Sequence, residues 1–178
     1  MTITHKKTAR QERRVAAELG GRRVPLSGAG AEKGDGRVAQ KFTKTSTGIT
    51  ETVALTLRIE NKLTAKTSYT LSCVDWDKLY RAASRCGEHP LFHVELYVVG
   101  LGQVQLAVIT ESFARFLGLP NHTAWTKDPA RSFNISWSRC NSGGLVPFGL
   151  KMHTPGGELH NLVIADYLTV RNLIQEKS

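Results

Sequence analysis

The chain has 178 residues, of which 40% are hydrophobic and 22% are charged. This length suits one domain with a real core and is too short for two comfortable ones. No apolar run approaches the roughly 20 residues that cross a bilayer, so we expect no membrane-spanning helix. No apolar segment follows the basic residues at positions 1–14, so we also expect no secretory signal.

Charge is the most informative property of the composition. Twenty-four Lys and Arg residues against fifteen Asp and Glu residues give a formal net charge of +9. A small domain this basic suits a polyanion, because each phosphate that it neutralises releases condensed counterions. A positive surface can also serve solubility alone. Nucleic-acid binding is therefore the expectation that charge favours, with solubility as the alternative.

The three cysteines, Cys73, Cys86 and Cys140, lie far apart, and none forms a CxxC pair. This spacing argues against a disulfide framework and against a structural zinc site. We expect three incidental thiols in a reducing cytoplasm.

The first expected element is a helix over residues 8–19 that ends at Gly20-Gly21, a typical C-cap signal. Glu12 lies three, four and seven positions before the apolar residues of this helix, which are Val15, Ala16 and Leu19. It therefore shares their face, where a carboxylate is costly unless something compensates it. We expect Arg10, Arg13 and Arg14 to project more towards solvent.

A glycine-rich loop follows over residues 22–36, and its spacing matches neither the P-loop nor the dinucleotide fingerprint. A short strand is expected at 37–42, and the polar residues 43–50 are expected to form a hairpin loop around Gly48. Residues 52–60 then alternate between apolar and polar side chains, as in a half-buried strand. Lys62 keeps the parity of Glu60, so the two side chains should stand side by side on the polar face.

Strand and helix patterns continue to interleave, which predicts an α/β or α+β fold with a mixed sheet. The remaining expected elements are a helix over 76–86 with Asp75 as its N-cap, strands at 91–99 and 103–109, a helix at 111–117, strands near 133–137, 147–153 and 158–165, and a terminal helix capped by Asp166.

The order of motifs resembles the PD-(D/E)xK nuclease superfamily, and more closely the phage and archaeal-type Holliday junction resolvases. The resemblance covers residues 8–115. It rests on the helix glutamate, on the phrase Gly-Arg-Arg-Val-Pro-Leu-Ser-Gly-Ala-Gly at 21–30 with Lys33-Gly34-Asp35, and on Ile59-Glu60-Asn61-Lys62 followed by Thr64 and Ser68-Tyr69. Gly34 replaces the nominal proline of the superfamily. The spacing from Asp35 to Glu60, 60 − 35 = 25 residues, is long for this group, and we expect the polar segment 43–50 to supply the excess.

The resemblance implies a restriction-endonuclease-like α/β core at residues 1–118, with a central mixed β-sheet flanked by helices. Residues 119–178 would form a C-terminal α/β extension packed on this core. The implied activity is Mg²⁺-dependent hydrolysis of DNA phosphodiesters, with Mn²⁺ as a substitute metal.

The resemblance also implies the site residues. The catalytic set is Glu12, Asp35, Glu60 and Lys62; the metal ligands are Asp35, Glu60 and the backbone carbonyl of Asn61; the DNA-contacting set is Arg22, Arg23, Ser27, Lys33 and Arg58. Lys62 would orient the attacking water or stabilise the pentacovalent charge. Glu12 would bind a second metal or a metal-bound water. Without the resemblance, Asp35 reads as a turn residue and Glu60 with Lys62 as a solvated strand face.

The implied substrate is a four-way DNA junction, cut by a homodimer whose two copies nick symmetric strands. The helix at 76–86 and the strand at 91–99 are expected to offer apolar surface for the dimer. No membrane and no organic cofactor are expected, and the location is the cytoplasm, that of a bacterial host if the chain is phage-encoded. Two alternatives stay open: another endonuclease of the same superfamily, restriction-type or replication-associated, and a non-catalytic DNA-binding module.

Two weaker patterns involve histidines and aromatic residues. His153 and His160 flank an expected turn; we expect unliganded surface histidines there, with a metal pair across the hairpin as the alternative. Trp125, Phe133 and Trp137 lie among cationic residues; we expect them to belong to the core or an interface, with stacking on unpaired bases as the alternative.

Overall fold

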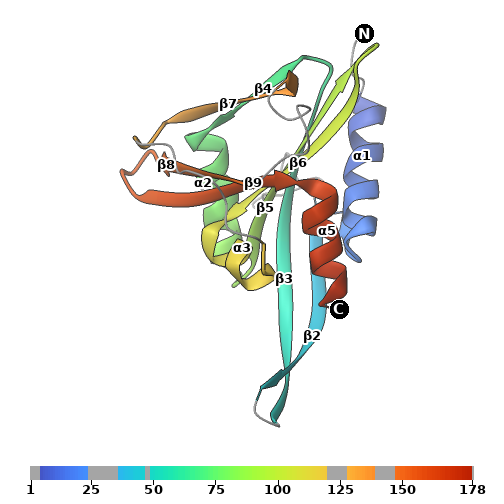
Figure 1. The fold of residues 1–178 in the computed structure, drawn as a ribbon, viewed down its shortest axis with the longest axis vertical. Coiled ribbons are helices and arrows are strands. Elements are labelled where there is room, and N and C mark those ends of the chain that lie inside the picture. Colours follow the sequence, from blue (N-terminus) through green and yellow to red (C-terminus); the bar gives the residue numbers. More distant parts are fainter. Residues whose placement is uncertain (1–4, 24–35, 47–48, 120–127, 139–146, 178) are drawn as a thin grey trace.

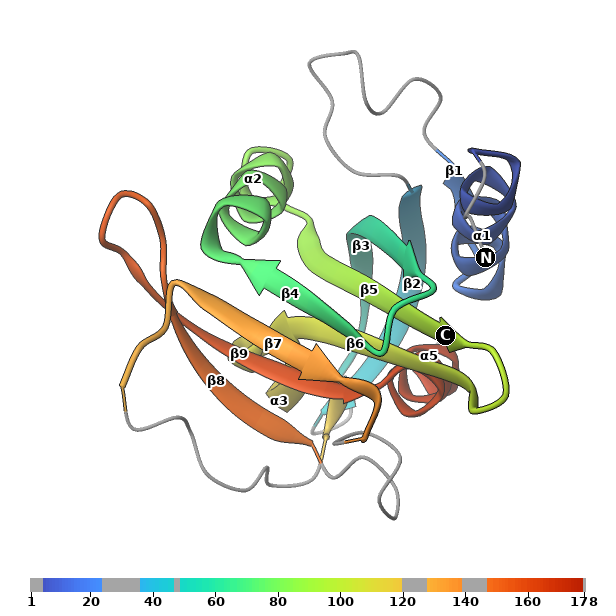
Figure 2. The same ribbon diagram turned by 90° about the horizontal axis from the view of Figure 1, so that it is seen from above.

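The computed structural model describes residues 5–23, 36–46, 49–119, 128–138 and 147–177. Its elements, in chain order, are α1 (His5–Glu18), β1 (Arg22–Arg23), β2 (Gly36–Ser46), β3 (Ile49–Thr64), β4 (Ser68–Ser72), α2 (Cys73–Ser84), β5 (His89–Val98), β6 (Gly102–Thr110), α3 (Glu111–Leu117), β7 (Ser132–Ser136), β8 (Phe148–His153), β9 (Leu159–Asp166) and α5 (Tyr167–Glu176). Seven strands form one sheet in the order β1-β2-β3-β5-β6-β9-β8, while β4 and β7 pair separately (Figures 1 and 2).

The sheet is mixed, because β3 and β5 run parallel whereas the other neighbouring strands run antiparallel. Helices flank it on both faces, so the fold is of the α/β class that the sequence predicted. Residues 119–178 contribute β9, which pairs with β6, and β8, which pairs with β9. The C-terminal segment therefore extends the same sheet.

Two buried clusters lie on opposite faces of the sheet. The first joins α1, α3 and α5 to one face, and Leu57 and Ile59 of β3 belong to it. The second joins α2, β4 and β7 to the other face, with Trp76 and Leu71 fully buried. Successive side chains of a strand point to opposite faces, so the central strands contribute to both clusters.

The long hairpin of β2 and β3 corrects one expectation. Its strands pair without interruption from Gly36 opposite Ile59 to Ser46 opposite Ile49. The expectation of a loop over 43–50 was therefore wrong, except at residues 47–48, which lie outside the described residues. Threonine is abundant in this segment, and its branched side chain favours strands even where the sequence looks polar. The hairpin extends away from the body of the molecule (Figure 1).

The helix ends follow side-chain capping. Asp166 caps α5 by accepting a hydrogen bond from the Thr169 backbone N–H, as expected. The expectation that Asp75 caps α2 was wrong: Ser72 is the N-cap, and its Oγ accepts from the Asp75 N–H at 3.1 Å. Ser72 also donates to Asp75 Oδ2 at 2.8 Å, so Asp75 supports the cap from within the first turn. None of the helices in the described ranges is long and apolar enough to span a membrane.

Replacing Leu57 tests the role of β3 in the first cluster. Leu57 has no exposed surface, so Leu57→Ala should lower the free energy of unfolding by about 3 kcal/mol through lost burial and a cavity. The matched control is Leu101→Ala, at a side chain that is 52% exposed, which should change it by less than about 0.5 kcal/mol. Urea unfolding measures both, and equal effects would contradict the assignment of Leu57 to the core.

Candidate functional site

Glu60 and Lys62 lie side by side on β3, as their parity predicted. The Lys62 Nζ lies 2.7 Å from Glu60 Oε1, and the side chains are 36% and 22% exposed, respectively. Both point away from Ile59, which is buried in the cluster against α1. They therefore lie on the face of the sheet that α2 and β4 share, and solvent reaches both.

Tyr69 of β4 adds a hydroxyl to this face. Burial raises the pKa of Tyr69 to about 12; the positive charge of Lys62 opposes the shift, and the negative charges of Asp75 and Glu60 add to it. The Tyr69 hydroxyl therefore stays protonated at neutral pH. It supplies a neutral hydrogen-bonding group near a carboxylate and an ammonium.

Glu12 is buried on α1, where only 7% of it is exposed. The expectation that this carboxylate shares the apolar face of the helix is confirmed, since Val15 and Ala16 beside it are also buried. Helix α1 packs on β1, β2 and β3. Because α1 covers the face of β3 opposite to Glu60 and Lys62, the structure does not bring Glu12 onto the face that carries Glu60.

Three expected site residues, Asp35, Ser27 and Lys33, lie outside the described residues. Arg22 is exposed on β1 at the edge of the sheet. Arg23 belongs to the same strand, and its side chain is not among those described.

Arg58 does not have the surroundings of a DNA-contacting residue. Its side chain is 3% exposed, and its Nε lies 2.5 Å from Glu88 Oε2. Arg37 of β2 lies 2.9 Å from the other oxygen of the same carboxylate. A guanidinium buried in such a pair holds the start of β5 against β2 and β3. We therefore leave Arg58 out of the DNA-contacting set.

The donors near Glu60 suit a hard cation only in part. Carboxylate oxygens are ligands that Mg²⁺ prefers, and Mg²⁺ often uses one or two of them together with waters. Among the described residues no group of three or more His, Cys, Asp or Glu side chains is gathered to hold a metal. Asn61 directs its buried side chain to the opposite face from Glu60, so only its backbone carbonyl remains as a candidate ligand on that side.

A second polar group, which the sequence did not predict, lies between α1 and the sheet. Gln11 Nε2 donates to Glu95 Oε2 at 3.3 Å, and Arg14 Nη2 lies 2.5 Å from the same oxygen. Arg14 also donates to Gln105 Oε1 at 3.3 Å. Arg14 is more exposed than Glu12, as expected, with 37% of its side chain accessible, but its ion pair with Glu95 also directs it over β5, which the sequence did not predict.

His93 lies at the centre of this group and has no exposed surface. Burial lowers the pKa of the His93 imidazole to about 3, with the hydrogen bond to Gln105 opposing the shift and the charge of Arg14 adding to it. The Nε2 lies 3.2 Å from Gln105 Oε1, an acceptor, so this nitrogen carries the proton. The Nδ1 then accepts from Gln11 Nε2 at 3.5 Å, and His93 is neutral at physiological pH.

One signal could have revealed this group. Leu91, His93 and Glu95 occupy alternate positions of a strand that is otherwise apolar. Two polar side chains on one face of a buried strand require partners from another element. The identity of those partners, on a helix 82 residues earlier, is not visible in the sequence.

The weaker histidine and aromatic patterns are accounted for by packing. His160 lies opposite Met152, and its Nδ1 accepts from the Trp76 indole N–H at 2.8 Å. His153 lies opposite Leu159, on the other face, so the two histidines are not placed as a metal pair. The expectation of a surface position was wrong for His160, which is 6% exposed. Phe133 and Trp137 pack against the second cluster, which agrees with the core alternative. Trp125 lies outside the described residues.

Comparison with known protein-family models gives no match, and no curated protein matches the chain either.

The buried imidazole predicts a specific acid sensitivity. The unfolded His93 has an ordinary pKa near 6.5, whereas the folded one has a pKa of about 3, so the unfolded state takes up the proton first as the pH falls. The contribution of neutral His93 to the free energy of unfolding should therefore be fully present above about pH 6.5 and be lost progressively as the pH falls below that value. Relative to His93→Gln, the native chain should lose about 2 kcal/mol more unfolding free energy between about pH 7 and pH 5. Parallel losses in urea titrations of both proteins would contradict a neutral buried His93.

Removing Glu88 tests the structural role of Arg58. Glu88→Ala leaves the buried Arg58 without this carboxylate and should cost about 3 kcal/mol of unfolding free energy. The control is Asp77→Ala, which removes the partner of Arg81, a residue whose side chain is 56% exposed, and should cost about 0.5 kcal/mol. Thermal and urea unfolding measure both, and a small effect of Glu88→Ala would return Arg58 to the DNA-contacting set.

Proposed function

We propose that the chain is a metal-dependent DNA endonuclease that hydrolyses phosphodiesters at four-way junctions. The observation that carries the proposal is the Lys62–Glu60 pair, with 2.7 Å between Nζ and Oε1, on a solvent-accessible face of a central strand. The pair belongs to the tripeptide Glu60-Asn61-Lys62, which has the residue types of the nuclease signature in the same order.

The proposed chemistry assigns each residue a task. When bound, Mg²⁺ would neutralise phosphate charge and lower the pKa of a water molecule. Glu60 is the ligand assigned to it here, with Asp35 and the Asn61 carbonyl added from the resemblance. Lys62 holds a positive charge 2.7 Å from the Glu60 carboxylate, where charge develops as the phosphodiester is attacked. Tyr69 remains a neutral hydrogen-bonding group beside them because burial keeps its pKa high.

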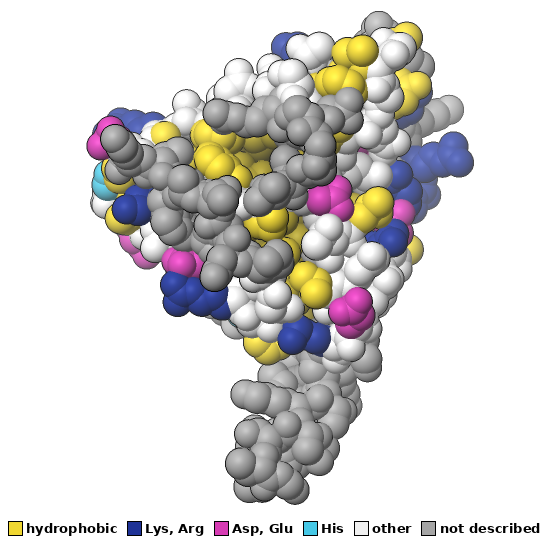
Figure 3. Space-filling view, viewed as in Figure 1, with side chains coloured by type: hydrophobic (Ala, Val, Ile, Leu, Met, Phe, Trp, Pro, Cys, Tyr) yellow, Lys and Arg dark blue, Asp and Glu magenta, His cyan; other side chains and the backbone are white. Residues whose placement is uncertain are grey.

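Charge supports a DNA substrate. The net charge of +9 exceeds what solubility requires of a domain this size. Arg22 is exposed at the sheet edge, and Arg10 and Arg13 are exposed on α1. Dark blue side chains gather at the edge of the molecule where α1 lies (Figure 3). Backbone phosphates would be contacted from these positions, with Arg23, Ser27 and Lys33 added from the resemblance.

A homodimer remains part of the proposal, with a smaller apolar surface than expected. Trp76 and Leu79 of α2 and the apolar residues of β5 up to Leu96 are buried within the chain, whereas Val74 at the start of α2 is 45% exposed. Val99, at the end of the expected segment 91–99, and Leu101 in the β5–β6 turn are 67% and 52% exposed. We also propose a reducing cytoplasm as the location, consistent with the free thiols of Cys73 and Cys86.

Cleavage assays test the assignment. Wild type with Mg²⁺ should nick a labelled four-way junction faster than a linear duplex of the same arm sequence, and EDTA should abolish cutting. Glu60→Gln and Lys62→Met should each reduce the rate by at least about 100-fold, because each removes a charge at the reacting phosphate.

Matched controls separate local chemistry from charge and stability. Glu158→Gln changes an exposed carboxylate, and Lys78→Met removes an exposed cation from α2, so both should cut like wild type. Cutting that survives Glu60→Gln would exclude Glu60 as a metal ligand. Equal cutting of linear duplex would favour another endonuclease activity, and junction binding without cutting would favour a non-catalytic module.

A further inference from the structure

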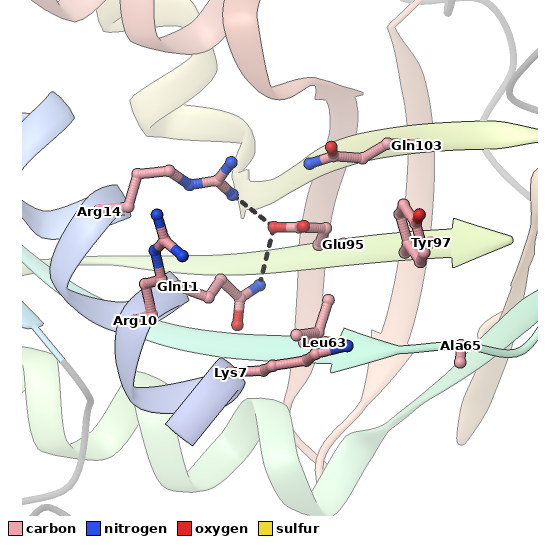
Figure 4. Close-up of a pocket in the computed structure, with 9 residues that line it drawn as sticks. All are labelled: Lys7, Arg10, Gln11, Arg14, Leu63, Ala65, Glu95, Tyr97 and Gln103. Atoms are coloured by element: carbon pink, nitrogen blue, oxygen red, sulfur yellow. Dashed lines mark hydrogen bonds and ion pairs between the residues drawn. The ribbon is translucent and has the colours of Figure 1, made fainter. Parts of the chain in front are cut away.

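A pocket of about 530 Å³ lies beside α1, on the opposite face of the sheet from Glu60 and Lys62. Its wall is formed by the N-terminal half of α1, the ends of β3 and β5, and the start of β6 (Figure 4). Leu63 of β3 lines it, whereas the neighbouring Lys62 points to the other face. The size is within the range of small-molecule sites.

The mouth of the pocket is positively charged. Lys7 and Arg10 line it and are exposed to solvent. Among the described residues that line it, Glu95 alone is acidic, and its charge is compensated because Arg14 and Gln11 both contact its Oε2, as the dashed lines in Figure 4 mark. An anionic group at the mouth would therefore meet two cations without meeting an uncompensated carboxylate.

The interior presents an acceptor that needs a donor. Gln11 is 5% exposed, and its Oε1 is buried without a hydrogen-bond partner among the described residues. The Gln11 Nε2 lies 3.3 Å from the Glu95 carboxylate, which can only accept a hydrogen bond. The amide nitrogen of Gln11 must therefore face Glu95, and its oxygen faces the other way. A buried carbonyl oxygen without a donor is costly, and a ligand N–H that meets it after a small rotation of the amide towards the pocket would remove that cost.

The remaining walls suit a flat, partly apolar group. Tyr97 lines the pocket, and 43% of its surface is exposed although it is a large aromatic residue. Leu63 and Ala65 line the pocket as well, and Gln103 adds a second amide (Figure 4). Aromatic side chains stack on nucleobases, and glutamine amides pair with base edges.

We propose that this pocket binds a nucleotide. The base lies against Tyr97 and Leu63 and donates an N–H to Gln11 Oε1, while the phosphate lies at Lys7 and Arg10. This goes beyond the cleavage function, because the pocket uses none of the catalytic residues and lies across the sheet from them. The same chemistry is offered by a free mononucleotide and by a nucleotide of an unpaired DNA strand.

Two binding measurements distinguish a free mononucleotide from a nucleotide within an unpaired strand. Both are made in EDTA, so that no hydrolysis occurs. Each of the four deoxynucleoside monophosphates is titrated calorimetrically, and a labelled single strand of about ten nucleotides is titrated by fluorescence anisotropy. Wild type should bind at least one of them. Gln11→Leu and Tyr97→Ala should each weaken binding at least about tenfold, through loss of the acceptor and of the stacking surface. Mononucleotide binding with this pattern identifies a free nucleotide as a ligand, and strand binding alone identifies a nucleotide within DNA.

Charge-matched variants make the result specific to the pocket. Arg10→Ala should weaken binding, whereas Lys78→Ala, which removes one exposed charge from α2, should not. Glu158→Gln, at an exposed carboxylate outside both sites, should bind as wild type does. Binding in EDTA is measured without cutting, so this proposal can fail or succeed apart from the nuclease proposal. Circular dichroism and thermal unfolding check that each variant folds. No binding at millimolar nucleotide or with the strand, or equal weakening by Arg10→Ala and Lys78→Ala, would overturn the proposal.

Discussion

The two-residue alternation of β3 is the constraint on which the rest of the molecule depends. Leu57, Ile59 and Leu63 point to the face that α1 covers, and Glu60 and Lys62 point to the other. Because a strand cannot shift by one residue without exchanging its faces, the buried residues hold the charged pair in place. The candidate cleavage site and the proposed nucleotide pocket therefore both depend on the register of β3. Because β3 pairs in parallel with β5, the same register places His93 beside Asn61 and Glu95 beside Leu63.

Buried polar groups then determine how the helices and loops approach this sheet. Glu95 draws Arg14 and Gln11 of α1 onto β5, and Glu88 joins Arg37 and Arg58 below the start of the same strand. A buried charge without its partner is far more costly than the pair, so these contacts specify position even where they add little net stability. Helix α1 is also tied to α5, since Gln175 donates to the Glu18 carbonyl and Tyr167 donates to the Glu18 carboxylate.

Local patterns in the sequence predicted local features well. The alternation of residues 52–60 placed Glu60 and Lys62 correctly, and the helix expected at 111–117 is present. The Asp166 cap followed from capping chemistry. The extension of the paired strands into 43–50 was missed because polarity was weighed above the strand preference of threonine. Ser72 was missed because Asp75 is an equally good cap residue. Arg58 looked accessible because its partner Glu88 lies 30 residues away, beyond what periodicity detects. The contact between Gln11 and His93 was missed for the same reason, because the two residues are 82 positions apart.

The central claim is that Glu60 holds a divalent metal on the open face of β3. The most direct measurement is an anomalous difference map from crystals grown with Mn²⁺, collected at the manganese absorption edge for wild type and Glu60→Gln. We expect a peak in contact with the Glu60 carboxylate, beside Lys62, that is absent from the variant. A map without a peak at Glu60, or a peak that persists in Glu60→Gln, would contradict the claim.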